Sequence, residues 1–419
     1  MNQIIKTICL LLFCHPGLYA AEILERHIDV RFQQTPLKEA LAIVARKGGF
    51  EWSYNANIVD GTKRISLVAN DWTVRETLYE LLGDGYEFKP NGQYLILKKR
   101  KKPKEQLSGY IKDASGQRVA NATIYDRRTL RATTTDSNGY YELRVKKSTE
   151  ITIARLNYRD TIFPMTSTSP RFQKVDLQVD NTPIKHGLTL EENLQKAATQ
   201  IERLFQVSLE KWNALNVPDS LHRHYQVGFL PKLGTNHTLS SKVVNDWSLN
   251  ILAGTSLGNR RFELGGIGNF TRKNMTGVQV GGVFNELRGN ASGLQIAGIY
   301  NVSDTLQGVQ VAGMVNKAQQ TRDLAIQVAG LLNKADGGKM LVQIGGISNR
   351  AGQVNGLQMA GLINAADTIE GLQVAGLLNR ARKVKGLQFG LFNSARELHG
   401  LQIGLLNRSG RRVLPFFNW

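Results

Sequence analysis

The first residues to consider for chemistry are His222 and His224, which stand two positions apart. Imidazole nitrogens are common zinc ligands, but a tight zinc site takes about three or four protein ligands at short, regular spacings. No further ligand residues accompany this pair at such a spacing. The sequence therefore predicts no metal site here.

An acidic turn is the second candidate for ion binding. Residues 135–141 read TDSNGYY, and Asp136 and Asn138 carry oxygen atoms of the kind that Ca²⁺ prefers. A tight Ca²⁺ site takes about six to eight oxygen ligands, so one Asp and one Asn are too few. We expect a structural turn instead, in which Asp136 caps the turn and Gly139 adopts a positive φ.

Catalytic motifs are absent from the chain. It has no G-x-S-x-G elbow and no Gly-rich loop with a phosphate-binding Lys between a strand and a helix. The adjacent Glu191 and Glu192 belong to an expected helix start, where negative charge is favourable. A hydrolase of envelope polymers would need a clustered acid pair or triad, which the sequence does not display. We therefore predict no catalytic residue, no cofactor and no enzymatic activity.

The first residues have the pattern of a secretion signal. A short positive amino-terminal region is followed by the apolar run Ile8–Phe13 and by the small residue Ala20. We predict a signal peptide over 1–20, because the run is too short to span a bilayer as a retained helix. Both cysteines, Cys9 and Cys14, lie inside it, so the mature protein is expected to have no thiol.

The charge of the chain bears on its partners. The 53 Lys and Arg residues exceed the 34 Asp and Glu residues, and the net charge is +19. Such a charge usually indicates nucleic acid, which an exported chain does not meet. Anionic envelope polymers, anionic lipid headgroups or lipopolysaccharide are the partners that such a charge allows, but the interpretation we favour is that the charge only keeps an exposed repeat surface soluble. We place the protein in the periplasm or at the outer membrane of a Gram-negative bacterium.

Residues 22–100 alternate between strand-like and helix-like patterns. TPLKEALAIVARKGGFEWSY contains an amphipathic helix that two glycines end. ISLVANDWTVRETLYELLGDGYEF contains a strand and a second helix, which starts with Thr73 and Glu76 at capping-box spacing. GQYLILKK completes a hairpin that turns at Pro90–Gly92. This order resembles the STN module, the short N-terminal domain of secretins and TonB-dependent receptors. The resemblance implies an α+β domain that contacts another protein in the periplasm, often an anti-sigma factor, and that has no catalytic residue.

Residues 101–106 are expected to form a basic linker, and residues 107–180 consist of short β-rich runs with turns between them. LSGYIKD, VANATIYD and TTTDSNGYYELRV resemble the carboxypeptidase regulatory-like domain, a small β-sandwich whose TD-x-x-G-x-F/Y turn matches residues 135–141. In Bacteroidota this domain commonly precedes the plug of outer-membrane transporters. No plug or barrel of transporter length follows here, so the resemblance does not imply transport.

Residues 188–216 predict an amphipathic helix. Thr189 and Glu192 form a capping box, and apolar residues then recur at three- and four-residue spacing. The helix would serve as a spacer, a partner helix or a cap on the domain that follows.

The C-terminal domain, predicted over 245–419, repeats one short motif, as in GLQVAGLLN at 371–379. Each unit ends in Asn, at intervals of 14 to 17 residues: Asn269, Asn285, Asn301, Asn316, Asn333, Asn349, Asn364, Asn379, Asn393 and Asn407. Each unit after the first carries Gln before it: Gln279, Gln295, Gln310, Gln327, Gln343, Gln358, Gln373, Gln388 and Gln402. Glu263 takes that place in the first unit. A fixed short period indicates a repeat architecture whose units bury their faces against one another.

Two architectures fit the repeat. In a β-solenoid, each unit is one coil, Leu and Val point inward, and the Asn and Gln amides stack at roughly 4.8 Å into hydrogen-bonded ladders. In an outer-membrane β-barrel, each unit is one strand with Leu, Val and Gly toward lipid. GLQFGLFN and GLQIGLLN lack one residue of the motif at the Ala-Gly. A one-residue deletion inside a continuous strand would turn later side chains to the other face, whereas at a corner it only tightens a turn. This favours the solenoid, with an irregular first coil at 247–259 and a closing cap at 413–419.

The motif also resembles a bacterial surface-repeat family built from such GLQ units, which implies a location rather than a mechanism. We therefore expect a multidomain, non-enzymatic envelope protein. It would comprise an α+β STN-like domain, a β-sandwich, an amphipathic helix and an all-β repeat scaffold at the outer membrane. Residues 22–100 would bind a periplasmic or inner-membrane partner of the anti-sigma kind. The alternative function is an outer-membrane β-barrel receptor or pore that signals through the STN-like domain to such a partner.

Overall fold

The structure is a computed structural model, and it describes residues 23–100, 105–145, 149–180, 216–217, 221–322 and 324–419. The predicted signal peptide, most of the basic linker and nearly all of the predicted helix over 188–216 lie outside the described residues. The chain divides into two compact units, of which the first holds residues 1–128 and 133–183 and the second holds residues 129–132 and 184–419.

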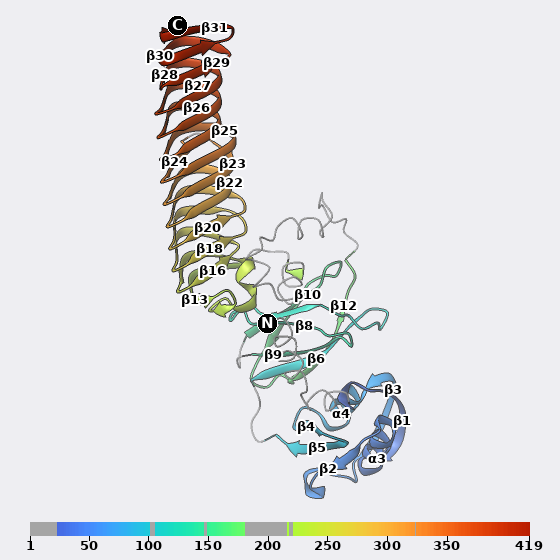
Figure 1. Cartoon of the computed structure of the whole chain (residues 1–419). Helices are drawn as coiled ribbons and strands as arrows, with labels where there is room; N and C mark the ends of the chain where they lie inside the picture. The colour runs from blue at the N-terminus through green and yellow to red at the C-terminus, as the bar shows by residue number, and fades with distance from the viewer. Residues whose placement is uncertain (1–22, 101–104, 146–148, 181–215, 218–220, 323) are drawn as a thin grey trace, which may run out of the picture. The chain divides into compact units, whose positions relative to one another are not determined.

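The first part of the first unit combines two helices with two small sheets (Figure 1). Its elements are β1 (His27–Pro36), α3 (Leu37–Gly48), β2 (Glu51–Ser53), η1 (Ala56–Ile58), β3 (Arg64–Thr73), α4 (Val74–Leu82), β4 (Tyr86–Asn91) and β5 (Tyr94–Lys99). Strands β1 and β3 pair antiparallel, and the other sheet has the order β2-β5-β4. Apolar side chains on one side of each helix, among them Leu41, Val44 and Leu78, form the buried core with β1 and β3. The elements agree with those expected from the sequence pattern.

The second part of the first unit consists of two facing sheets. Its strands are β6 (Gln106–Asp113), β7 (Thr123–Asp126), β8 (Ala132–Thr134), β9 (Tyr140–Arg144), β10 (Thr149–Ala154), β11 (Thr161–Met165) and β12 (Phe172–Leu177). One sheet has the order β11-β10-β7-β8 and the other β12-β6-β9, and buried residues of both sheets form one core. The turn expected at Asp136 is present: its carboxylate accepts the N–H groups of Asn138 and Tyr140 at 2.9 Å, and Gly139 has a φ of 71°.

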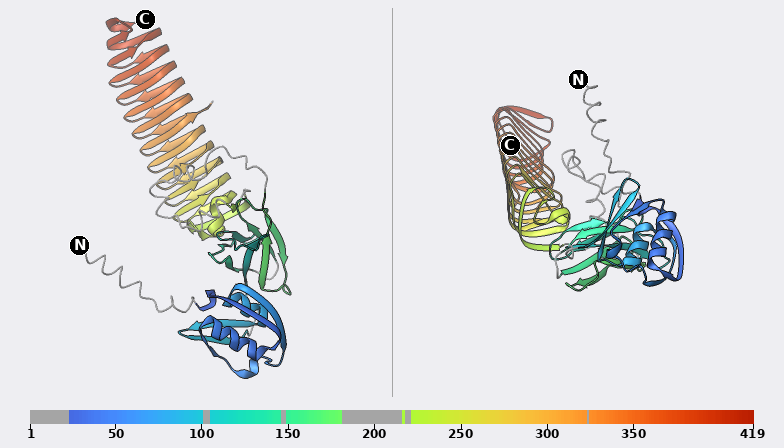
Figure 2. Two further views of the ribbon diagram at one scale, coloured as in Figure 1. Left: turned by 90° about the vertical axis from the view of Figure 1, so that its right-hand side faces the viewer. Right: turned by 90° about the horizontal axis from the view of Figure 1, so that it is seen from below.

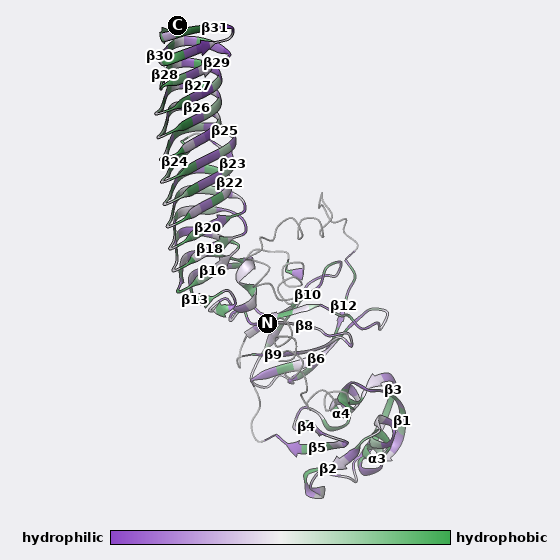
Figure 3. Ribbon diagram, viewed as in Figure 1, coloured by the Kyte–Doolittle hydropathy of each residue, from purple (hydrophilic) through white to green (hydrophobic). Residues whose placement is uncertain are grey.

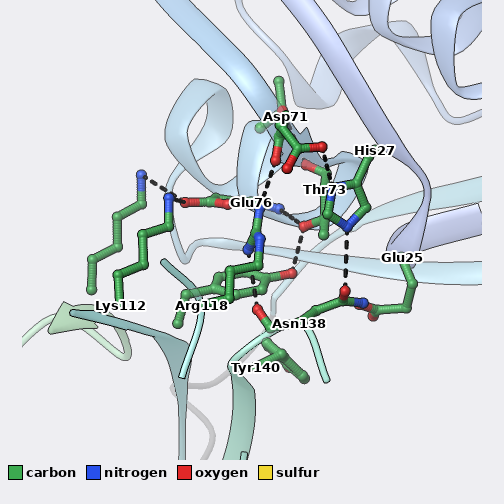
Figure 4. Close-up of polar contacts among 12 residues, drawn as sticks. Glu25, His27, Asp71, Thr73, Glu76, Lys112, Arg118, Asn138 and Tyr140 are labelled. Atoms are coloured by element: carbon green, nitrogen blue, oxygen red, sulfur yellow. Dashed lines mark hydrogen bonds and ion pairs between the residues drawn. The ribbon is translucent and has the colours of Figure 1, made fainter. Parts of the chain in front are cut away.

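A buried carboxylate lies between these two parts of the first unit (Figure 4). Glu76 in α4 is fully buried, and Lys112 Nζ and an Arg118 guanidinium nitrogen each lie 3.1 Å from its oxygens. The Glu76 N–H donates to the Thr73 hydroxyl at 3.0 Å, as the capping-box spacing predicts. A third cation, Lys174, lies 3.9 Å from the buried Glu76 carboxylate, so ion pairs to this carboxylate replace the reciprocal hydrogen bond of the capping box.

The second unit is a β-solenoid of about 11 coils (Figures 1 and 2). Its elements are β13 (Leu221–Leu230), β14 (Leu233–Gly234), η2 (His237–Lys242), β15 (Val243–Asn250), β16 (Ala253–Ser256), β17 (Gly258–Gly265), β18 (Gly268–Thr271), β19 (Met275–Gly281), β20 (Phe284–Leu287), β21 (Asn290–Ala297), β22 (Tyr300–Ala312), β23 (Val315–Thr321), β24 (Ile326–Ala329), β25 (Leu332–Gly345), β26 (Ser348–Ala360), β27 (Ile363–Ala375), β28 (Leu378–Phe389), β29 (Phe392–Ala395), β30 (Glu397–Ser409) and β31 (Arg412–Asn418).

Equivalent repeat positions lie beside one another in successive coils. Asn364 pairs with Asn379, and Gln373 pairs with Gln388, in parallel strands. The predicted solenoid is therefore confirmed. The alternative, in which each repeat is one strand of an up-and-down barrel, is wrong for these residues, because such strands would pair antiparallel.

The Ala-Gly of most repeats is a corner between two strands, whereas in the last unit β30 runs without a break through Gly404. Strand β27 ends at Ala375, Gly376 and Leu377 turn the chain, and β28 begins at Leu378. In the shortened unit the corner keeps two residues, Gly390 and Leu391, and the strand before it ends one residue earlier, at Phe389, which pairs with Val374. The deletion therefore removes the Ala at the strand end rather than tightening the turn, and it leaves the register intact, because Gln388 still pairs with Gln373 and Asn393 with Asn379.

The two ends of the solenoid differ from the repeats. At the start, β13 pairs in parallel with β15, so that Leu221 opposes Val243. The solenoid therefore begins before the predicted boundary at residue 245. At the other end, β31 turns back and pairs antiparallel with β30, which confirms the predicted closing cap. Because β31 occupies the last edge of the parallel stack, no further coil can be added there in the same way.

Among the described residues, no helix combines the length and the apolar character needed to cross a membrane.

Candidate functional site of the solenoid

The Asn residues of the repeats form one continuous ladder inside the solenoid. From Asn269 to Asn407, the side-chain Nδ2 of each Asn donates to Oδ1 of the Asn in the following coil, at 2.8–3.1 Å. Most of them also donate to a backbone carbonyl of that coil, as Asn364 does to Val374 at 2.6 Å. The Asn side chains are 0–2% exposed. The amides therefore satisfy each other in an interior that water does not reach.

The Gln residues form a second ladder with the opposite direction. Nε2 of each Gln donates to Oε1 of the Gln in the preceding coil, at 2.6–2.9 Å. One ladder therefore donates toward the C-terminal end of the stack and the other toward the N-terminal end. The amide dipoles within one row add up. Because the two rows run in opposite directions, the summed dipole of one row offsets that of the other across the narrow core.

The ends of the Gln ladder are specific residues. At the C-terminal end, Asn418 of the capping strand donates to Gln402 at 2.8 Å. At the N-terminal end, Glu263 accepts from Gln279 at 2.8 Å and from Thr271 at 3.2 Å. A carboxylate is acceptor-only, so it can end a row in which every amide donates toward it. Burial raises the pKa of Glu263, although the hydrogen bonds from Gln279 and Thr271 lower it in part.

The orientation of Leu and Val corrects the sequence-based interpretation. We predicted that these residues point inward, but in GLQVAGLLN the residues on either side of the inward Gln373, Leu372 and Val374, are on the outer surface. The inward positions hold the amides, the small Ala375 and, farther along each coil, buried aliphatic residues such as Ile369. A side-chain period of two explains the result, because burying Gln places both of its neighbours outside.

One side of the solenoid is therefore apolar on its outer surface. Four columns contribute to it: the residues on either side of Gln, and the two residues before Asn. In the column at the Ala-Gly corner, Leu362, Leu377, Leu391 and Leu405 are 39–52% exposed. Figure 3 shows hydrophobic segments that repeat from coil to coil along the stack. Contiguous apolar surface of this extent is unusual for a monomer in water and indicates an interaction surface.

Exposed aromatic residues are found toward both ends of this apolar side. Tyr225 and Trp247 lie in the first coils, and Phe389, Phe417 and Trp419 lie in the last coils and the cap. Aliphatic residues predominate in the columns between them, although Phe262, Phe284 and Tyr300 also stand there. Tyr and Trp, which combine an apolar ring with a polar O–H or N–H, are favoured where an apolar surface meets water, whereas Phe389 and Phe417 add only apolar surface.

A basic groove lies beside the apolar side. It encloses about 670 Å³, and its charged lining comprises Asp336, Arg350, Asp367, Arg380, Arg382, Arg396 and Arg408. Leu378 and Arg380 flank the inward Asn379 in one strand. The apolar column formed by the residues just before Asn therefore lies next to the residues just after Asn, several of which are arginines. Within the described part of the chain, none of the five arginines makes an ion pair with a carboxylate. Their charge is available to an anionic partner.

The structure also brings together a cluster of two histidines and an aspartate at a place where the sequence predicts no metal site. Asp246 of β15 lies beside the two histidines of β13: Oδ1 is 3.0 Å from His222 Nε2, and Oδ2 is 2.8 Å from His224 Nδ1. Hydrogen bonds from His222 and then His224 lower the pKa of Asp246 to about 2. The third residue is one coil away in the sequence, so local ligand spacing could not reveal it. The sequence pattern that could have indicated this cluster is a pair of histidines two residues apart in a strand, followed by an aspartate about one coil later.

Sequence comparisons offer no assignment for this surface: no protein-family model matches the chain, and no curated protein matches it.

The ladder leads to a stability prediction. Replacing Asn364 with Leu should lower the free energy of unfolding by about 1–3 kcal/mol, because a donor of Asn349 and an acceptor of Asn379 lose their partner in the buried row. Denaturant unfolding measures the change. The matched control exchanges the same residue types in reverse: Leu362→Asn, on the exposed corner column, should change the stability by less than about 0.5 kcal/mol. Equal effects of both substitutions would contradict a stabilising ladder.

The Glu263 terminus leads to a pH prediction. Its folded-state pKa is raised above the unfolded value, so its contribution to stability is complete below the unfolded pKa and is lost as the pH rises through the folded pKa. Glu263→Gln removes this ionisation, so the melting temperature of the variant relative to the wild type should rise by a few degrees from acid to alkaline pH. Thermal melts of both proteins across pH test it. A difference in melting temperature that stays constant across pH would show that ionisation of Glu263 does not matter.

Proposed function

We propose that this protein is a non-enzymatic component of the Gram-negative cell envelope, whose solenoid lies along an anionic lipid surface at the outer membrane. The observation that carries the proposal is the apolar side of the solenoid and the basic groove beside it. Apolar columns would enter the boundary between headgroups and acyl chains, and the arginines would contact anionic headgroups, as in interfacial amphipathic elements. The predicted signal peptide supports an exported location.

The geometry of the interior explains why a scaffold suits this role. Each coil rises by roughly 4.8 Å, so about ten coils give a straight apolar side about 48 Å long. The ladders join every coil to its neighbours through buried hydrogen bonds, so the surface columns keep their alignment. A rigid, repetitive surface can spread many weak contacts over a membrane, and their sum gives stable association.

Binding of the mature chain to vesicles tests the proposal. Residues 22–419 should float with vesicles of phosphatidylethanolamine and phosphatidylglycerol in a density gradient, and weakly with phosphatidylcholine alone. Substituting Ser for Leu377, Leu391 and Leu405 should reduce the bound fraction about tenfold or more, since three exposed leucines contribute several kcal/mol of transfer free energy.

The control for this experiment lies on the polar side of the same coils. Lys383 and Glu397 form an exposed ion pair with 3.4 Å between charged atoms, and replacing both with Ser should leave flotation unchanged. If the wild-type protein does not float, or if the triple variant floats equally well, the lipid proposal is wrong. A wild-type dimer in light scattering that the triple variant loses would show that a second copy, rather than lipid, covers the apolar side.

We also propose that residues 22–100 bind a periplasmic or inner-membrane protein of the anti-sigma kind. The resemblance to the STN module supports this, as does a two-stranded sheet, β1–β3, which in the described chain leaves a strand edge free on each side. Val68 in β3 is 54% exposed. An added strand from a partner would complete such a sheet through backbone hydrogen bonds.

Capture from envelope extracts tests the partner proposal. Tagged residues 22–100 should retain an inner-membrane or periplasmic protein, and Val68→Lys should reduce the retained amount by disturbing the exposed strand. Tyr94→Lys is the matched control, because Tyr94 is similarly exposed but lies in the other sheet. An empty capture across salt and detergent conditions would remove the signalling role.

A further inference from the structure

The first strand of the solenoid presents two histidines on one face. His222 and His224 are two residues apart in β13, and alternate residues of a strand point to the same side. Their side chains are 36% and 76% exposed. Strand β15 runs parallel to β13 in the next coil and places Asp246 beside them, with a side chain only 12% exposed. A nearly buried carboxylate thus supports two accessible imidazoles.

The distances among these three residues fit a small metal site. One ligand atom from each of the three lies within 4.8 Å of the others, and the two His–Asp distances are 3.0 and 2.8 Å. Ligand bonds to Zn²⁺ are about 2.0–2.2 Å long, so tetrahedral ligands lie about 3.4 Å apart. The three groups need to move by about an ångström to share one ion.

The hydrogen-bonding arrangement itself favours a cation. Both carboxylate oxygens of Asp246 are directed at imidazole nitrogens, and the two rings stand edge to face with centroids 5.1 Å apart. A single divalent ion could replace the two N–H groups and satisfy the same three atoms. Strand pairing holds the backbones of both strands, so the ligands are preorganised.

We propose that His222, His224 and Asp246 bind one divalent transition-metal ion, with Zn²⁺ as the best-fitting class. Two imidazoles and one carboxylate are a ligand set for Zn²⁺, and the fourth position would face water. The ion cross-links β13 to β15 and so fastens the first coil to the stack. The proposal does not depend on lipid or partner binding by the rest of the chain.

Metal titration of the mature chain tests the site. After removal of metal with EDTA and dialysis, calorimetry with Zn²⁺ should show one ion bound per chain, and the melting temperature should rise by several degrees. Co²⁺ in place of Zn²⁺ should give the visible absorption of a tetrahedral complex, which hydrogen bonding alone would not produce. Absence of both the temperature rise and the absorption would overturn the proposal.

Variants identify the ligands. His224→Gln changes an exposed side chain, so the protein should fold normally and yet lose at least tenfold in Zn²⁺ affinity. Asp246→Asn should have the same effect while it keeps the size of the side chain. His399→Gln is the control, because His399 is an exposed histidine near the other end of the solenoid. Equal Zn²⁺ affinity in wild type, His224→Gln and Asp246→Asn would show that the ion binds elsewhere and contradict the assignment.

Discussion

The buried amides of Asn and Gln are the constraint on which the solenoid depends. An amide in a dry interior has two donors and an acceptor to satisfy, and an unsatisfied group costs about 1–3 kcal/mol. Only an identical residue directly above and below can satisfy it in the same way at every level. The repeat must therefore keep its register from coil to coil, and a coil that slips would break both ladders at once. This accounts for the fidelity of Gln and Asn in a motif whose other positions vary among Leu, Ile, Val, Met and Phe.

Burial of the amides determines what the surface becomes. With Gln, Ala and Asn directed inward, the residues between them face outward, and those residues are apolar in nearly every unit. The result is a solenoid whose core is partly polar and one of whose sides is apolar. Contiguous apolar surface of this kind is typical of an interaction site, and the proposed function assigns lipid to it. The neighbouring arginines make an anionic lipid surface a chemically consistent cover.

The sequence allowed the architecture of the repeats to be predicted because both of its signals are periodic. The interval between Asn residues predicts coils, and the one-residue deletion at Gly390 and Gly404 predicts a corner at that place. The direction of the side chains could not be derived by the usual rule that apolar residues are buried, since here the satisfied amide ladder overrides it. The pairing of His224 with Asp246 also escaped prediction, because it depends on the register between β13 and β15 in a coil that lacks the repeat motif.

The two ends show how a repetitive stack is limited. Every interior coil has a neighbour on both sides, and these neighbours satisfy its hydrogen-bonding groups. Donors and acceptors without a partner therefore arise only at the two terminal coils. At the C-terminal end, β31 reverses its direction and Asn418 supplies the donor that the last Gln would otherwise lack. At the other end of the Gln row, Glu263 accepts without needing to donate onward, and the polar network of Gln226, Asn236 and Asn245 continues into the first coil. The terminal coils thus depart from the repeat where hydrogen-bond satisfaction requires residues different from those of the interior.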